Sequence, residues 1–207
     1  MSHPTLGTNR RTLVGALGLG TLGLGTLGLA SPAQAAAPAG LVIPPDALGT
    51  GVPEIYLVVD GITGDSTDKD FRGAIELLAL DWGVKAKRST SGSGSGAGKP
   101  VAGDVKFAAR SSSASPKLLQ RLVSGRMVRR ATVHVMRRGE NRVEAMTLDL
   151  KDVLVTGYEV MSASGLPVEV VSLAMNGLTE TWIPQRADGS LGTPVSVTWD
   201  LRTGKVT

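Results

Sequence analysis

The chain has 207 residues, of which 42% are hydrophobic and only 3% aromatic, and its formal charge is +4. It contains no cysteine, which excludes a disulfide framework, a thiolate zinc site and a cysteine nucleophile. The charge includes two arginines near the start, and the rest of the chain is nearly balanced. Composition alone therefore does not indicate a nucleic acid or an anionic membrane as a partner.

The first 35 residues have the features of an export signal. Arg10 and Arg11 precede an apolar run that glycine and threonine dilute, and the stretch N-R-R-T-L-V resembles a twin-arginine signal. Ala33 and Ala35 then supply the small residues that signal peptidase requires, which predicts cleavage after Ala35. An uncleaved anchor is the alternative, because the run is close to a membrane-spanning length. Its glycines disfavour that alternative, so we predict a secreted protein without a stable membrane anchor after cleavage.

The chain after the leader is expected to form a linker and one domain. Residues 36–53 are rich in alanine, proline and glycine, which is typical of a flexible linker. Residues 54–207 have the length of one ordinary domain with its own hydrophobic core.

Alternation of apolar and polar residues dominates this domain and predicts β-strands. The expected strands are residues 54–59, 75–84, 105–109, 131–136, 144–150, 152–161, 168–183 and 195–201. Such strands, separated by turn residues, indicate a mainly β fold, an antiparallel two-sheet barrel or sandwich.

One short helix is expected between the third and fourth of these strands. Ser115 can cap it, Pro116 suits its first position and Gly125 can end it. Its apolar stripe consists of Leu118, Leu119, Leu122 and Val123. This stripe is expected to pack against the sheet.

A glycine-rich stretch, G-S-G-S-G-A-G-K-P at residues 92–100, ends like a phosphate-binding loop. Ser93 stands where that motif has its first glycine, and Pro100 stands where it has the hydroxyl residue. A strand rather than a helix follows. We therefore interpret the stretch as a flexible loop between strands, with Lys99 at a protein contact, and expect no nucleotide or other cofactor.

The residues that could carry catalysis or bind a metal are few. His134 is the only histidine after the leader, and no G-x-S-x-G elbow presents a serine to it. The turn D-G-I-T-G-D-S-T-D-K-D at residues 60–70 holds Asp60, Asp65, Asp68 and Asp70, which could bind calcium, but their spacing differs from an EF-hand loop. An ordinary acidic turn is favoured, with calcium left open.

Arginines make the middle of the chain basic. They are Arg126, Arg129, Arg130, Arg137, Arg138 and Arg142. Single-stranded nucleic acid binding would need aromatic residues among them, and these are absent. Subunit contacts and solvated strand ends are the favoured uses, so we expect no nucleic acid partner.

In chain order, several motifs resemble the hemolysin-coregulated protein (Hcp) family, the tube protein of type VI secretion. They are IYLVVDGITGDS (55–66), IELLALDWGV (75–84), GAGKPVAGDVKF (96–107), SPKLLQRLVSG (115–125), LDLKDVLVTGYEV (148–160) and WIPQRADGSLGTPVSVTWDL (182–201). The Q-x-A-D-G turn in the last motif is the most distinctive. Together they cover nearly the whole chain after the linker.

The resemblance implies an antiparallel barrel with a flanking helix, no catalytic residues, and hexameric rings with a central channel that can stack. Tube proteins are ordinarily made without a signal peptide, so the leader indicates a secreted Hcp-like protein with free rings, and a secreted effector or surface ligand as a further partner. The alternative is a monomeric secreted binding module on the same fold. A secreted hydrolase using His134 or the acidic turn is the least favoured hypothesis.

Overall fold

The structure is a computed structural model, and it describes residue 41 and residues 54–88, 97–137, 142–162 and 165–207. The predicted leader with Arg10, Arg11, Ala33 and Ala35 lies outside the described residues, as does the predicted linker apart from Leu41. Within the described ranges, no helix is both long and apolar enough to cross a membrane.

Strands dominate the described part of the chain, which confirms the mainly β prediction. The elements are β1 (Ile55–Val59), β2 (Ile75–Asp81), β3 (Val84–Arg88), β4 (Ala97–Ala102), β5 (Val105–Arg110), α1 (Ser115–Ser124), β6 (Val128–Arg137), β7 (Val143–Met161), β8 (Val168–Ala174), β9 (Gly177–Trp182) and β10 (Val195–Asp200).

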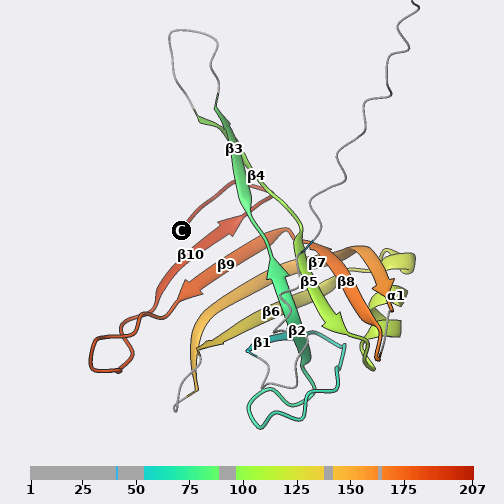
Figure 1. Cartoon of the computed structure of the whole chain (residues 1–207). Helices are drawn as coiled ribbons and strands as arrows, with labels where there is room; N and C mark the ends of the chain where they lie inside the picture. The colour runs from blue at the N-terminus through green and yellow to red at the C-terminus, as the bar shows by residue number, and fades with distance from the viewer. Residues whose placement is uncertain (1–40, 42–53, 89–96, 138–141, 163–164) are drawn as a thin grey trace, which may run out of the picture. The chain divides into compact units, whose positions relative to one another are not determined.

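Six strands close into an antiparallel barrel in the order β7-β6-β1-β2-β5-β8, with β8 pairing back onto β7 (Figure 1). Strand β7 serves both ends because its first half pairs with β6 and β9 and its second half with β8. Asp152 lies between the halves with a φ of 50°, a left-handed conformation that aspartate tolerates. Residues 144–150 and 152–161 were predicted as two strands, and they are one bent strand because the chain changes partner without leaving the sheet.

The barrel interior is one hydrophobic core built mainly from aliphatic side chains. The alternation of β6 is as predicted, with Val133 fully buried inside and His134 on the outer face. Helix α1 contributes Leu118, which is 1% exposed, to the core. The predicted stripe is only partly buried, because Leu119 and Val123 remain 42% and 76% exposed.

Of the two predicted caps of α1, the C-terminal one is confirmed and the N-terminal one is not. Gly125 ends the helix in the left-handed conformation with a φ of 61°, as its lack of a Cβ allows. The predicted N-cap is wrong by one residue, because Ala114 occupies that position and Ser115 begins the helix. The Ser115 hydroxyl instead accepts a hydrogen bond from the Ser112 N–H at 2.8 Å.

Two parts extend beyond the barrel. Strands β9 and β10 continue the sheet from β7, so the run 168–183 is two strands, not the predicted one. The β3–β4 hairpin projects from β2 and β5 (Figure 1). Residues 97–100 were predicted as loop, but they pair with β3. Strand formation at these weakly β-forming residues is decided by the partner strand.

Candidate functional site

The four carboxylates of the 60–70 turn bind separate partners. The contacts are Asp60 Oδ2 to Arg129 Nε at 3.7 Å, Asp65 to the N–H and hydroxyl of Ser113 at 3.0 and 2.5 Å, Asp68 to Arg142, and Asp70 Oδ2 to Lys69 Nζ at 4.0 Å. Across the residues that the structure describes, no three His, Asp or Glu side chains are arranged to hold a metal ion. The carboxylates therefore tie the turn to other segments of the chain and do not converge on one site.

Asp68 organises this turn. Its Oδ1 accepts the N–H of Asp70 at 2.9 Å and that of Phe71 at 3.2 Å, while its Oδ2 accepts Arg142 and, at 3.4 Å, the Tyr56 hydroxyl. Desolvation raises the pKa of Asp68, but the hydrogen bonds and the charge of Arg142 outweigh it and leave that pKa below its usual range. Asp68 is therefore a structural anion.

Aromatic rings continue the contact between the turn and the outer face of the barrel. The rings of Tyr56 and Phe71 stack with centroids 4.5 Å apart, and the Arg142 guanidinium carbon lies 4.8 Å from the Tyr56 centroid and 5.7 Å from that of Phe71. We call Tyr56, Asp68, Phe71 and Arg142 the clasp. It buries Tyr56 completely although its strand position faces away from the core.

His134 lies at the edge of the clasp. Its Nδ1 is 2.6 Å from Glu144 Oε1, and its ring is 5.0 Å from that of Phe71. The His134 side chain is 23% exposed. These contacts make His134 a packing and hydrogen-bonding residue of the outer sheet face.

The sequence did not predict the contacts of Arg142. It was grouped with the other arginines as a basic residue, because nothing local indicates that it stacks on two rings. The available signal was indirect: Tyr56 and Phe71 are two of very few aromatics in the chain, and they lie shortly before and directly after the acidic turn.

The base of the turn is closed by backbone hydrogen bonds. Gly64 N donates to Gly73 O at 2.8 Å, Ser66 N donates to Ala74 O at 3.1 Å, and Gly73 N donates to Ser66 O at 2.7 Å. A Cβ on Gly64 would lie 2.4 Å from the Ala74 carbonyl oxygen, so only glycine fits there. This explains the second glycine of the D-G-I-T-G motif.

A buried polar pair lies between β7 and β8. Glu169 is fully buried, and its Oε2 accepts the Tyr158 hydroxyl at 2.8 Å, while its Oε1 has no hydrogen-bond partner among the described residues. Burial, followed by the hydrogen bond to Glu169 and its charge, raises the pKa of Tyr158. No sequence signal predicts this pair, because Glu169 looks like an ordinary polar residue of an alternating strand.

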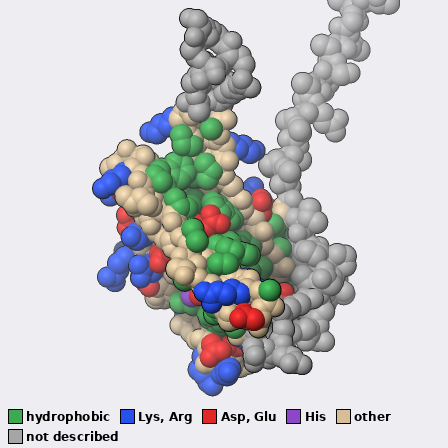
Figure 2. All heavy atoms as spheres, turned by 90° about the vertical axis from the view of Figure 1, so that its left-hand side faces the viewer, with side chains coloured by type: hydrophobic (Ala, Val, Ile, Leu, Met, Phe, Trp, Pro, Cys, Tyr) green, Lys and Arg blue, Asp and Glu red, His purple; other side chains and the backbone are tan. Residues whose placement is uncertain are grey.

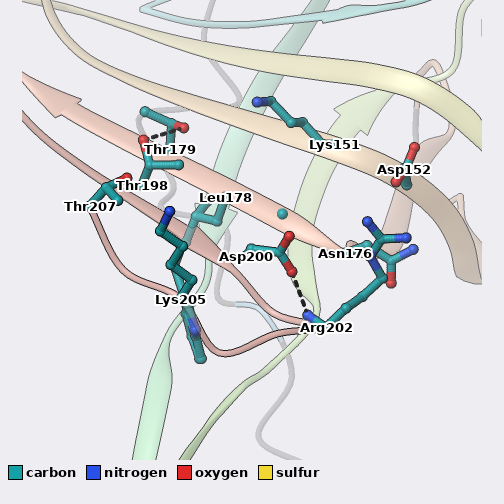
Figure 3. Close-up of a pocket in the computed structure, with 12 residues that line it drawn as sticks. Lys151, Asp152, Asn176, Leu178, Thr179, Thr198, Asp200, Arg202, Lys205 and Thr207 are labelled. Atoms are coloured by element: carbon teal, nitrogen blue, oxygen red, sulfur yellow. Dashed lines mark hydrogen bonds between the residues drawn. The ribbon is translucent and has the colours of Figure 1, made fainter.

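A hollow of about 260 Å³ lies beside β9, β10 and the chain end. Figure 3 shows Lys151, Arg202 and Lys205 around it, with Asp200 between them. The Asp200 carboxylate accepts the N–H groups of Arg202 and Thr203, and the Thr203 hydrogen bond is the main reason that its pKa is lowered. The described lining contains no histidine and no serine.

The β9–β10 extension has two unlike faces, and we call it the wing. Cross-strand pairs place Trp182, Val195 and Val197 on one face, together with Glu180 opposite Val197. The three apolar side chains are 50%, 66% and 44% exposed. The other face carries hydroxyls, with Thr179 bonded to Thr198 and Thr181 to Ser196 at 3.0 Å each. Figure 2 shows that hydrophobic side chains gather on this side of the molecule.

The Q-R-A-D-G turn follows β9. Gln185 Nε2 donates to Gly189 O at 3.1 Å, and Gly189 has a φ of 83°. Arg137 at the end of β6 donates to Gln185 Oε1 and to Ile183 O at 3.1 and 3.0 Å, and its guanidinium lies 5.6 Å from the Trp182 ring centroid. The turn and Arg137 together hold the wing against the barrel.

Comparisons with known proteins agree with this architecture. The family model described as "Type VI secretion system effector, Hcp" matches residues 56–182. Protein hcp1 of Pseudomonas aeruginosa is 30% identical over 154 residues, which are 72% of this chain and 95% of that protein. A solved type six secretion system protein is similar with a TM-score of 0.70 at 22% identity, covering 75% of this chain and 100% of its own. Hcp1 from Salmonella typhimurium is similar with a TM-score of 0.62 at 24% identity, covering 74% and 98%.

Proposed function

Because this chain belongs to the Hcp family of type VI secretion proteins, we propose that it is a structural protein that assembles into hexameric rings. The observation that carries the proposal is the exposure of Trp182, Val195 and Val197 on one face of the wing. Soluble proteins rarely expose such a patch unless it contacts another protein. Stacking of the rings and transport of an effector in their channel belong to the same proposal.

A second exposed apolar group lies away from the wing, at the end of β7 and before β8. Met161 and Leu166 are 51% and 65% exposed, and we call them the far patch. Figure 1 shows β9 and β10 on one side of the barrel and β8 with α1 on the other. Two unlike surfaces on different sides give a head-to-tail contact, which generates a ring when the rotation closes. We propose that the wing of one copy contacts the far patch of the next.

Introducing charged residues on the wing should therefore dissociate the ring into monomers. In the full chain carrying Val195→Glu with Val197→Glu, light scattering and negative-stain imaging are expected to show monomers where the wild type shows rings. Two buried carboxylates at a contact cost far more than the contact gains. Val123→Glu is the matched control, because Val123 is 76% exposed on α1, outside both patches. A wild type that stays monomeric at high concentration would favour the binding-module alternative.

Mixing variants separates a head-to-tail contact from a symmetric one. Met161→Glu with Leu166→Glu should also give monomers, and equal amounts of this variant and the wing variant should form dimers. Each supplies the surface that the other lacks. Assembly of the far-patch variant alone into rings would contradict the head-to-tail contact.

We also propose that residues 1–35 are a cleaved twin-arginine leader and residues 36–53 a linker, which makes this a secreted Hcp-like protein. Replacing Arg10 and Arg11 with lysine is expected to abolish export, because the twin-arginine route reads that pair. The measurement is immunoblotting of the culture medium and the cell fraction. Undiminished secretion would rule the route out, while the ring proposal would still be open to its own test.

A further inference from the structure

The β3–β4 hairpin stands apart from the barrel as a two-stranded ribbon (Figure 1). Its base is a pair of glycines, where Gly103 N donates to Gly83 O at 2.9 Å. A ribbon of two strands is only marginally stable on its own in water. A partner surface would stabilise the ribbon, and the side chains on its two faces indicate the chemistry of that partner.

The two faces differ in chemistry. Cross-strand pairs place Val84 opposite Ala102 and Ala86 opposite Pro100, so four apolar residues share one face at the base of the ribbon. Val84 is 44% exposed, and Ala86 and Pro100 are exposed as well. Figure 2 shows hydrophobic side chains below the hairpin tip with basic side chains on either side.

The other face carries lysines beside Val101, which is 66% exposed. Lys85 lies opposite Val101, and Lys99 lies two residues from Val101 on β4, so the two lysines share this face. The sequence of residues 84–102 adds Lys87 and Arg88 and contains no acidic residue. Among the ion pairs of the described residues, none involves Lys85 or Lys99.

We propose that this hairpin binds an anionic phospholipid surface. A soluble polyanion would need only the cations, whereas an amphipathic element with an apolar face beside basic residues fits the boundary between lipid headgroups and acyl chains. The apolar residues are small and none is aromatic, so the contact is shallow and reversible. Lys99 would then contact lipid headgroups instead of a neighbouring subunit.

Assembly multiplies this contact. One hairpin binds weakly, since each basic residue near an anionic surface contributes about a fivefold factor to the partition coefficient. A ring presents one hairpin per subunit, and linked weak contacts add up to strong binding. This amplification rests on the proposed ring, but the binding of a single hairpin does not.

The test measures sedimentation of the full chain with vesicles of phosphatidylcholine alone or mixed with phosphatidylglycerol. Lys85→Gln with Lys99→Gln is expected to lower partitioning onto the mixed vesicles about 25-fold, because two basic contributions are lost. Val84→Ser with Ala86→Ser should also weaken it. Lys69→Gln with Lys117→Gln is the control, because it changes the charge equally and should leave partitioning unchanged. All variants carry the same leader, so its contribution cancels when they are compared.

Mass measurement in the same buffer separates this proposal from the ring. If the protein forms rings that do not bind the mixed vesicles, only the lipid proposal is overturned. If it is monomeric and binds the vesicles weakly in a lysine-dependent manner, the lipid proposal is supported and the ring proposal is contradicted. Equal binding to polyphosphate, unaffected by Val84→Ser with Ala86→Ser, would overturn it in favour of a soluble polyanion. Loss of the ring in the lysine variant would overturn it in favour of a subunit contact.

Discussion

Replacing Gly64 with alanine is expected to lower the free energy of unfolding by about 3 kcal/mol, roughly one per hydrogen bond at the base of the turn. The new Cβ would lie 2.4 Å from the carbonyl oxygen and 2.8 Å from the carbonyl carbon of Ala74, and both are backbone atoms that no rotamer change can move. The turn must therefore separate from residues 73–74, and the bonds of Gly64, Ser66 and Gly73 are lost together.

Chemical denaturation followed by circular dichroism measures this effect. Gly83→Ala is the control, because no atom lies within 4 Å of a Cβ at Gly83. Its unfolding midpoint should stay close to that of the wild type. A Gly64→Ala protein with an unchanged midpoint would show that the turn accommodates the methyl group, and the close approach would then carry no stability.

Replacing Arg142 with alanine is expected to cost about 2 kcal/mol, from two cation–π contacts and an unpaired carboxylate. The Asp68 side chain is only 13% exposed, so water would replace the guanidinium poorly. Arg142→Lys should recover part of the loss, since lysine keeps the charge but not the planar group that covers both rings. The same denaturation experiment checks both variants.

Arg130→Ala is the matched control for the loss of an ion pair. Arg130 Nε lies 3.2 Å from Asp149 Oδ1, but the Arg130 side chain is 55% exposed. Exposed pairs contribute at most about 1 kcal/mol. If Arg130→Ala were as damaging as Arg142→Ala, the stacking on Tyr56 and Phe71 would not be the source of the effect.

The pH dependence of stability should change with Arg142. Asp68 has a pKa below its ordinary value of 3.8, so its contribution is fully present above that value and is lost as pH falls through the lower folded-state pKa. Wild-type unfolding free energy should therefore fall with acid in this range. In Arg142→Ala the fall should be smaller, because one cause of the lowered pKa is gone.

Family and fold class follow from the sequence because both depend on local and ordered signals. Alternation in β6 assigns Val133 to the core and His134 to the outer face, and Gly125 ends α1 as its lack of a Cβ predicts. The motifs around the acidic turn and the Q-x-A-D-G turn lie in family order. Each of these signals depends on residues close together in the sequence, so it can be recognised without the tertiary structure.

Strand boundaries were predicted less well, for a physical reason. Residues 97–100 look like loop, and they form a strand only because β3 pairs with them. Likewise β7 stays in the sheet through Asp152, since new partners take over where earlier ones end. Pairing over a long sequence separation is a tertiary property, and local propensity does not contain it.

The sequence by itself determined the family, the barrel class and the lack of a phosphate-loop motif, because composition and residue order carry that information. Only the tertiary structure decided that Arg142 lies over two aromatic rings, that the acidic turn divides its carboxylates among separate partners, and that Val195 and Val197 lie on an uncovered face of the wing. These depend on which distant segments meet in space. The uncovered face is what directs the first assembly experiment to the wing.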